Sequence, residues 1–170
     1  MLPLRSVILG NCLRYLDTRP NEFENLRGQA RWRRLERCAR ALSERLKTAG
    51  RPERKHRTLL HGDAKAANFL HTSDETACAA YDFQYVGSGY GEQDLVMLLV
   101  SSAAYMDDET EKEYLSTYNE ALCELCPKAR ESHTLEICTM HYELALLDYV
   151  RFMAGWGNFF HIHIFRFRTL

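Results

Sequence analysis

The residues 59–70, "LLHGDAKAANFL", place several reactive side chains directly after an apolar run. An aspartate, Asp63, is followed five residues later by an amide, Asn68, and a lysine, Lys65, lies between them. A carboxylate can accept a hydroxyl proton while an amide oxygen a short loop away coordinates a divalent cation. The stretch therefore predicts a shaped loop that combines proton acceptance with metal binding.

A second carboxylate, Asp82, follows a predicted β-hairpin. The segments "NFLHT" (68–72) and "ACAAYDF" (77–83) are typical of two short strands, and "SDE" (73–75) between them is typical of a turn. If the turn centres near Glu75, antiparallel pairing brings Asn68 opposite Asp82. Two hard oxygen ligands at one end of a hairpin suit Mg²⁺.

The remaining elements are predicted to be mainly helical. Apolar residues at helical spacing predict a helix over 30–49, ended by Gly50 and Pro52, and further helices over 109–125 and 135–153. The glycine-rich stretch 86–93 is interpreted as a flexible loop. Asp94 is expected to cap a helix over the apolar residues 95–106.

Composition excludes several classes of protein. The 170 residues are 46% hydrophobic and 26% charged, with a formal net charge of −1. These values are ordinary for a globular protein and give no long-range attraction to nucleic acid or to an anionic membrane, so neither is expected as a partner. No apolar run approaches a membrane span, and six scattered cysteines are expected to be reduced, which together predict a cytoplasmic protein.

The chain resembles the aminoglycoside phosphotransferase and choline kinase-like superfamily, including its ecdysteroid kinase-like branch. The resemblance is carried by "LLHGDAKAANFL", by "YDFQYVGSGYGEQDL" (81–95) and more weakly by "LLDYVRFMAGWG" (146–157). It implies an α+β, protein kinase-like C-lobe, mainly helical, with a short hairpin carrying the catalytic and metal-binding loops. It also implies ATP-dependent transfer of the γ-phosphoryl group to an alcohol group of a small molecule.

The resemblance also implies a role for each residue of the motif. Asp63 corresponds to the catalytic base or to a group that orients the hydroxyl, and Asn68 and Asp82 correspond to the ligands that hold Mg²⁺ and, through it, ATP. Lys65 matches a lysine that neutralises charge on the transferring phosphoryl group. His61 and Asp94 are expected to be structural supports of the loop.

The sixty residues before the catalytic loop contain no glycine-rich strand-turn-strand. The chain is therefore predicted to be one C-lobe over 1–170 whose N-lobe is mostly or wholly absent, as a fragment, a shortened enzyme or a non-catalytic kinase-like binding protein. It divides into a leading helical segment (1–56), the catalytic and metal-binding loops with their hairpin (57–92), and a helical subdomain (93–170). The surface that the N-lobe would cover is expected to favour association.

A different class of protein is also considered, a zinc-binding interaction module. Its four ligands would be Cys123, Cys126, Cys138 and His141, in two pairs with a spacing that a structural zinc site can use. Cys138 and His141 lie within an apolar helical pattern, however, which favours buried helical side chains over metal ligands.

Overall fold

The computed structural model describes residues 41–42, 56–102 and 106–154. Residues 41 and 42 are helical. The rest of the helix predicted over 30–49 lies outside the described residues, as does most of the leading segment 1–56. The absence of an N-lobe stays a prediction.

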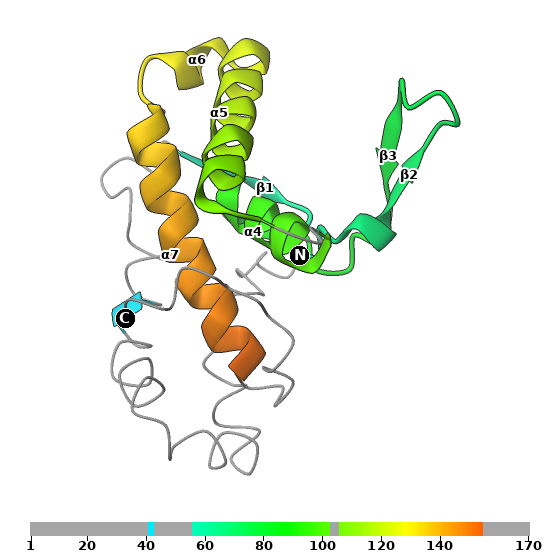
Figure 1. Cartoon of the computed structure of the whole chain (residues 1–170), viewed down its shortest axis with the longest axis horizontal. Helices are drawn as coiled ribbons and strands as arrows, with labels where there is room; N and C mark the ends of the chain where they lie inside the picture. Colours follow the sequence, from blue (N-terminus) through cyan, green and yellow to red (C-terminus); the bar gives the residue numbers. More distant parts are fainter. Residues whose placement is uncertain (1–40, 43–55, 103–105, 155–170) are drawn as a thin grey trace, which may run out of the picture.

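Two small antiparallel sheets frame the predicted loop. Strand β1 (Arg57–Leu60) pairs with β4 (Gly87–Tyr90), and β2 (Phe69–His71) pairs with β3 (Cys78–Ala80). A single turn of 3₁₀ helix, η1 (Ala66–Asn68), leads into β2. Figure 1 shows the β2–β3 hairpin standing away from the long helices.

The interpretation of residues 86–93 as a flexible glycine loop is wrong, because Gly87–Tyr90 forms a buried strand. A Cβ at Gly89 would lie 2.2 Å from Oε1 of Gln93 and 2.5 Å from Cδ1 of Leu60. Glycine in a strand often marks such a close approach by neighbouring atoms. Gly89 thus leaves room for neighbouring side chains to pack against the strand. The high glycine content of this segment therefore does not mark a flexible loop.

The helices follow the sequence pattern closely. They are α4 (Glu92–Ser102), α5 (Asp108–Leu125), the short α6 (Pro127–Arg130) and α7 (Leu135–Ala154). The helices predicted over 109–125 and 135–153 are confirmed to within one residue at each end. Helix α5 is capped by Asp107, whose carboxylate accepts a hydrogen bond from the N–H of Thr110 at 2.8 Å.

Asp94 does not cap α4, which corrects the sequence prediction. The helix begins two residues earlier, at Glu92, and the N–H of Asp94 donates to the carbonyl of Gly91 at 3.0 Å. Its side chain therefore does not cap the helix and instead contacts another part of the chain. Hydrophobicity set the helix but could not fix its first residue.

The main core lies between α4, α5 and α7. It consists of Val96, Leu99, Leu115, Cys138, Tyr142, Ala145 and Leu146, all buried. Helix α4 packs along α7, and α5 also contacts α7 (Figure 1). Helices and small sheets together form the α+β arrangement that the sequence predicted. In the described part of the chain, no helix is long and apolar enough to cross a membrane.

Candidate active site

The loop after β1 is held in place by a carboxylate from α4. Oδ2 of Asp94 accepts a hydrogen bond from the N–H of His61 at 2.7 Å, and Oδ1 accepts one from the N–H of Gly62 at 2.9 Å. Gly62 has a φ of 85°, a left-handed conformation that glycine adopts without strain. Burial raises the pKa of Asp94, and the two hydrogen bonds partly offset this effect.

Asp63 lies at the centre of a small polar network. Its Oδ2 accepts hydrogen bonds from Nζ of Lys65 at 2.8 Å and from Nδ2 of Asn68 at 3.0 Å. Nδ2 of Asn68 also donates to the backbone carbonyl of Asp63 at 2.8 Å. Both side-chain contacts use Oδ2, and the described residues supply no hydrogen bond to Oδ1. The loop thus fixes the carboxylate while one of its oxygens can still accept a proton.

Lys65 is charged at neutral pH and belongs to this network. The hydrogen bond with Asp63 raises the pKa of Lys65, and the negative charges of Asp63 and Asp82 act in the same direction. The Lys65 side chain is 43% exposed, whereas that of Asp63 is 14% exposed. The ammonium group therefore lies at the mouth of the network, where an incoming anion can reach it.

His61 uses both ring nitrogens to hold the loop. Nε2 donates to the carbonyl oxygen of Tyr81 at 2.8 Å, and Nδ1 accepts from the N–H of Asp63 at 3.3 Å. These partners require the neutral tautomer with its proton on Nε2. The ring also packs against Phe83, with centroids 4.6 Å apart. With both nitrogens engaged, His61 positions Asp63 and Tyr81 and has no free nitrogen for a proton transfer.

The hairpin exists, but its predicted register is wrong by one residue. Phe69 pairs with Ala80, so that Asn68 lies opposite Tyr81, and the N–H of Tyr81 donates to the Asn68 carbonyl at 3.1 Å. The turn is therefore not centred on Glu75, as the sequence argument assumed. In an antiparallel pair a shift of this size moves each side chain against a different neighbour.

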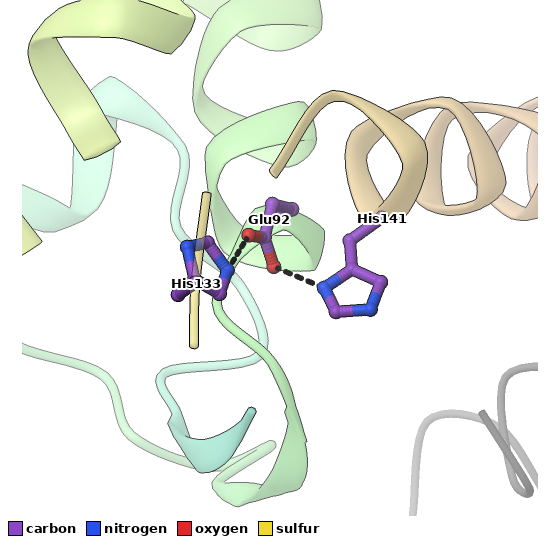
Figure 2. Close-up of side chains that lie close together, drawn as sticks. All are labelled: Glu92, His133 and His141. Atoms are coloured by element: carbon purple, nitrogen blue, oxygen red, sulfur yellow. Dashed lines mark ion pairs between the residues drawn. The ribbon is translucent and has the colours of Figure 1, made fainter. Parts of the chain in front are cut away.

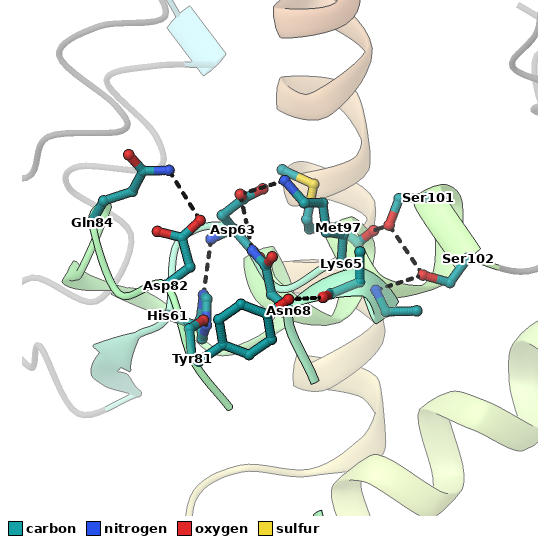
Figure 3. Close-up of polar contacts among 12 residues, drawn as sticks. His61, Asp63, Lys65, Asn68, Tyr81, Asp82, Gln84, Met97, Ser101 and Ser102 are labelled. Atoms are coloured by element: carbon teal, nitrogen blue, oxygen red, sulfur yellow. Dashed lines mark hydrogen bonds and ion pairs between the residues drawn. The ribbon is translucent and has the colours of Figure 1, made fainter. Parts of the chain in front are cut away.

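Asp82 reaches the site through an unusual backbone conformation. Its φ is 63°, in the left-handed region that aspartate tolerates better than most residues. The strand β3 has already ended at Ala80, so the direction of the Asp82 side chain is set by this turn of the backbone. Figure 3 shows Asp82 with Asp63 and Asn68, and Nε2 of Gln84 donates to its Oδ2 at 3.3 Å. Strained residues of this kind cluster at functional sites.

One contributor to the site was not found from the sequence. Oγ of Ser102, at the end of α4, accepts a hydrogen bond from the N–H of Ala66 at 3.0 Å and so ties η1 to the helix (Figure 3). Burial raises the pKa of Tyr149 on α7, and the charge of Asp63 acts in the same direction. Ser102 belongs to none of the motifs found in the sequence, so only its contact with Ala66 reveals it.

The four residues of the proposed zinc module are not brought together. Cys126 is exposed at the end of α5, while Cys138 is fully buried on α7. In the part of the chain that the structure describes, the group of three or more metal-binding side chains is a different one, Glu92, His133 and His141. The cysteine module is therefore not favoured.

The comparison with protein families agrees with the geometry of the loop. Residues 8–133, well over half of the chain, match the family model described as "Phosphotransferase enzyme family". The chain therefore belongs to the phosphotransferase enzyme family. No curated protein and no solved structure matches it significantly. The resemblance seen in the sequence is confirmed at the level of this family, while the ecdysteroid kinase-like branch and the C-lobe assignment stay predictions.

Proposed function

We propose that this chain carries the catalytic loop of an ATP- and Mg²⁺-dependent phosphotransferase acting on a hydroxyl group of a small molecule. One observation carries the proposal. Asp63 is fixed by Lys65 and Asn68 through Oδ2, on a loop whose two preceding N–H groups are bound by Asp94. Membership of the phosphotransferase family supplies the reaction class.

The residues present fit the cofactor that this family uses. Asn68 commits Nδ2 to Asp63, which leaves its amide oxygen as the atom that can bind a cation. Asp82 adds a carboxylate, and hard oxygen donors of these two kinds are what Mg²⁺ prefers. When bound, Mg-ATP supplies the phosphoryl group and the positive charge that stabilises its transfer.

Asp63 would act on the acceptor. Its Oδ1 would orient the substrate hydroxyl and take its proton, and the hydrogen bonds at Oδ2 would keep the carboxylate correctly oriented. Lys65 would place its positive charge beside the phosphoryl group, for which its exposed position is suitable. His61 would hold the loop and take no part in proton transfer.

The test is a phosphotransfer assay on the full 170-residue chain. ATP and Mg²⁺ are supplied with a panel of alcohols that includes amino sugars, amino alcohols and sterols, and ADP formation is compared with and without each alcohol. Acceptor-dependent turnover that is lost on replacing Asp63 supports the proposal. Mg-ATP binding without turnover for any acceptor would instead indicate a non-catalytic kinase-like protein.

A further inference from the structure

A second cluster of reactive side chains lies in the core, away from the loop. Glu92 begins α4, His133 precedes α7, and His141 lies on α7. Their side chains are 1%, 4% and 3% exposed, respectively. One ligand atom of each lies within 4.8 Å of those of the other two, and Figure 2 shows both rings directed toward the carboxylate.

The contact between His133 and Glu92 is not an ordinary hydrogen bond. Nε2 of His133 lies 2.8 Å from Oε1 of Glu92, yet that buried oxygen has no hydrogen-bond partner among the described residues. On the other side of the ring, Nδ1 lies 2.9 Å from Oδ1 of Asn119. An amide oxygen can only accept, so Nδ1 carries a proton, and Nε2 is the ring nitrogen that faces the carboxylate. The two atoms are a nitrogen and an oxygen donor of the kinds that bind zinc, and they face one another in the core.

His141 adds a second unsatisfied nitrogen at the same place. Its Nδ1 is buried, has no hydrogen-bond partner among the described residues, and lies 3.8 Å from Oε2 of Glu92. Burial lowers the pKa of His141, and the charge of Glu92 opposes this effect. The ion-pair partners that the structure gives the buried Glu92 are these two histidines, and a buried carboxylate is costly without a compensating charge.

We propose that Glu92, His133 and His141 bind a structural Zn²⁺ ion. Two imidazole nitrogens and one carboxylate oxygen form a common zinc donor set. The bond from Nδ1 of His133 to Asn119 matches the outer contact that metal-binding histidines typically make. A fourth position remains for a water molecule or for His56, whose ring centroid lies 5.2 Å from that of His133.

The site differs from the cysteine module considered from the sequence and shares with it only His141. Cys138 lies near Glu92, but burial, followed by the charge of Glu92, raises the pKa of its thiol to about 12. Among the described residues, the group whose metal-binding atoms all lie within 4.8 Å of one another consists of Glu92, His133 and His141 and does not include Cys138. The expected ligands are therefore nitrogen and oxygen.

The proposed ion would also help to fix the position of the catalytic loop. Glu92 stands two residues before Asp94, whose carboxylate binds the N–H groups of His61 and Gly62. An ion bound by Glu92 and His141 would join the start of α4 to α7 and so fix the residue that holds the catalytic loop. The zinc proposal does not depend on phosphotransfer, because it rests on buried residues outside the loop.

The first experiment measures metal in the full chain. The protein is produced with zinc in the medium, dialysed against metal-free buffer and analysed by inductively coupled plasma mass spectrometry. We expect about one zinc per chain, as a closed structural site requires. A content below about one-tenth of this, together with no binding in a zinc titration, would overturn the proposal.

Cobalt substitution identifies the ligands. A Co²⁺ complex of the full chain should show visible d–d bands without the intense near-ultraviolet band of a thiolate-to-cobalt charge transfer. A strong charge-transfer band that disappears in Cys123→Ser or Cys138→Ser would assign the metal to cysteines and contradict the proposed ligand set.

Matched variants complete the test. Glu92→Gln and His141→Gln should each lower zinc content at least tenfold, whereas His71→Gln, which changes an exposed histidine of β2, should not. If the buried variants fail to fold, removal of zinc from the wild-type chain with a chelator gives the answer. The melting temperature should then fall by about 5 to 10 °C and recover when zinc is added back. Full zinc content in both variants, or unchanged melting after removal, would refute the site.

Discussion

The carboxylate of Asp94 accepts a hydrogen bond from the backbone N–H of His61 at 2.7 Å, although the two residues are 33 positions apart. The second oxygen of Asp94 accepts from the next N–H, that of Gly62, at 2.9 Å. A residue at the start of a helix thus fixes the turn from which Asp63 emerges. The arrangement of the catalytic loop depends on α4 as much as on its own sequence.

Replacing Asp94 should loosen this turn. In Asp94→Asn the amide can accept only through one oxygen, so one N–H of the loop faces an NH₂ group and loses its partner. We expect the free energy of unfolding to fall by about 1 to 3 kcal/mol, together with a lower phosphotransfer rate. Urea unfolding measures the first effect. Glu124→Gln removes the same charge from an exposed site on α5 and should change neither the stability nor the rate. Equal stability of both variants would contradict the role of Asp94 in holding the turn.

Asp63→Asn should remove most phosphotransfer and keep the fold. The substitution has nearly the same shape but cannot take a proton, and general-base catalysis contributes a factor of about 10² to 10⁴. The rate at saturating Mg-ATP and acceptor is the measurement, with circular dichroism as a check on folding. Asp74→Asn, in the exposed hairpin turn, is the matched control. A variant at position 63 with the wild-type rate would show that the proton goes elsewhere.

Asp82→Asn should weaken the binding of Mg²⁺ without destabilising the chain. Asparagine tolerates the left-handed backbone at φ 63°, which alanine would strain, and the change removes one negative charge from an exposed residue that we propose as a Mg²⁺ ligand. We expect the Mg²⁺ concentration for half-maximal rate to rise at least about tenfold. Titration of activity with Mg²⁺ at fixed ATP tests this. An unchanged half-maximal concentration would remove Asp82 from the metal site.

Gly91→Ala should destabilise the junction between β4 and α4. An added Cβ would lie 2.1 Å from Oη of Tyr118, which is too close for any contact. Overpacking of this kind costs about 1 to 3 kcal/mol. The double variant with Tyr118→Phe, which deletes the hydroxyl, should recover part of the loss in a double-mutant cycle. Additive effects of the two changes would mean that the hydroxyl is not the obstacle.

The cap of α5 predicts a dependence of stability on pH. The N–H of Thr110 donates to Asp107 and lowers the pKa of that carboxyl below its usual 3.8. Because the folded-state pKa is lower than that of the unfolded chain, the stabilisation is complete above pH 3.8 and is lost as pH falls through the folded value. Asp107→Ala should lower the melting temperature at pH 7 by roughly 2 to 4 °C.

The difference between wild type and Asp107→Ala should then narrow as the pH is lowered from 7 toward 3. Differential scanning calorimetry across this range measures the difference. Glu124→Ala, which changes a residue of the same helix that does not cap it, is the control. A gap in melting temperature that stays constant below pH 3.8 would mean that the cap does not act through its charge.

The amino-acid sequence by itself determined the features that depend on neighbouring residues. Helical spacing of apolar side chains located α5 and α7 to within a residue, because this periodicity repeats every few positions. The five-residue step from Asp63 to Asn68 likewise lies within one short loop, so the contact between their side chains was contained in the motif. The match to the phosphotransferase family includes this loop.

Only the tertiary structure decided the features that join distant segments. The pairing of Asn68 with Tyr81, in place of Asp82, depends on where the hairpin turns, and the sequence allowed a shift of one residue. Gly87–Tyr90 became a strand because β1 lies beside it. Glu92, His133 and His141 meet because α4 packs against α7, and no local pattern relates residues from three separate segments.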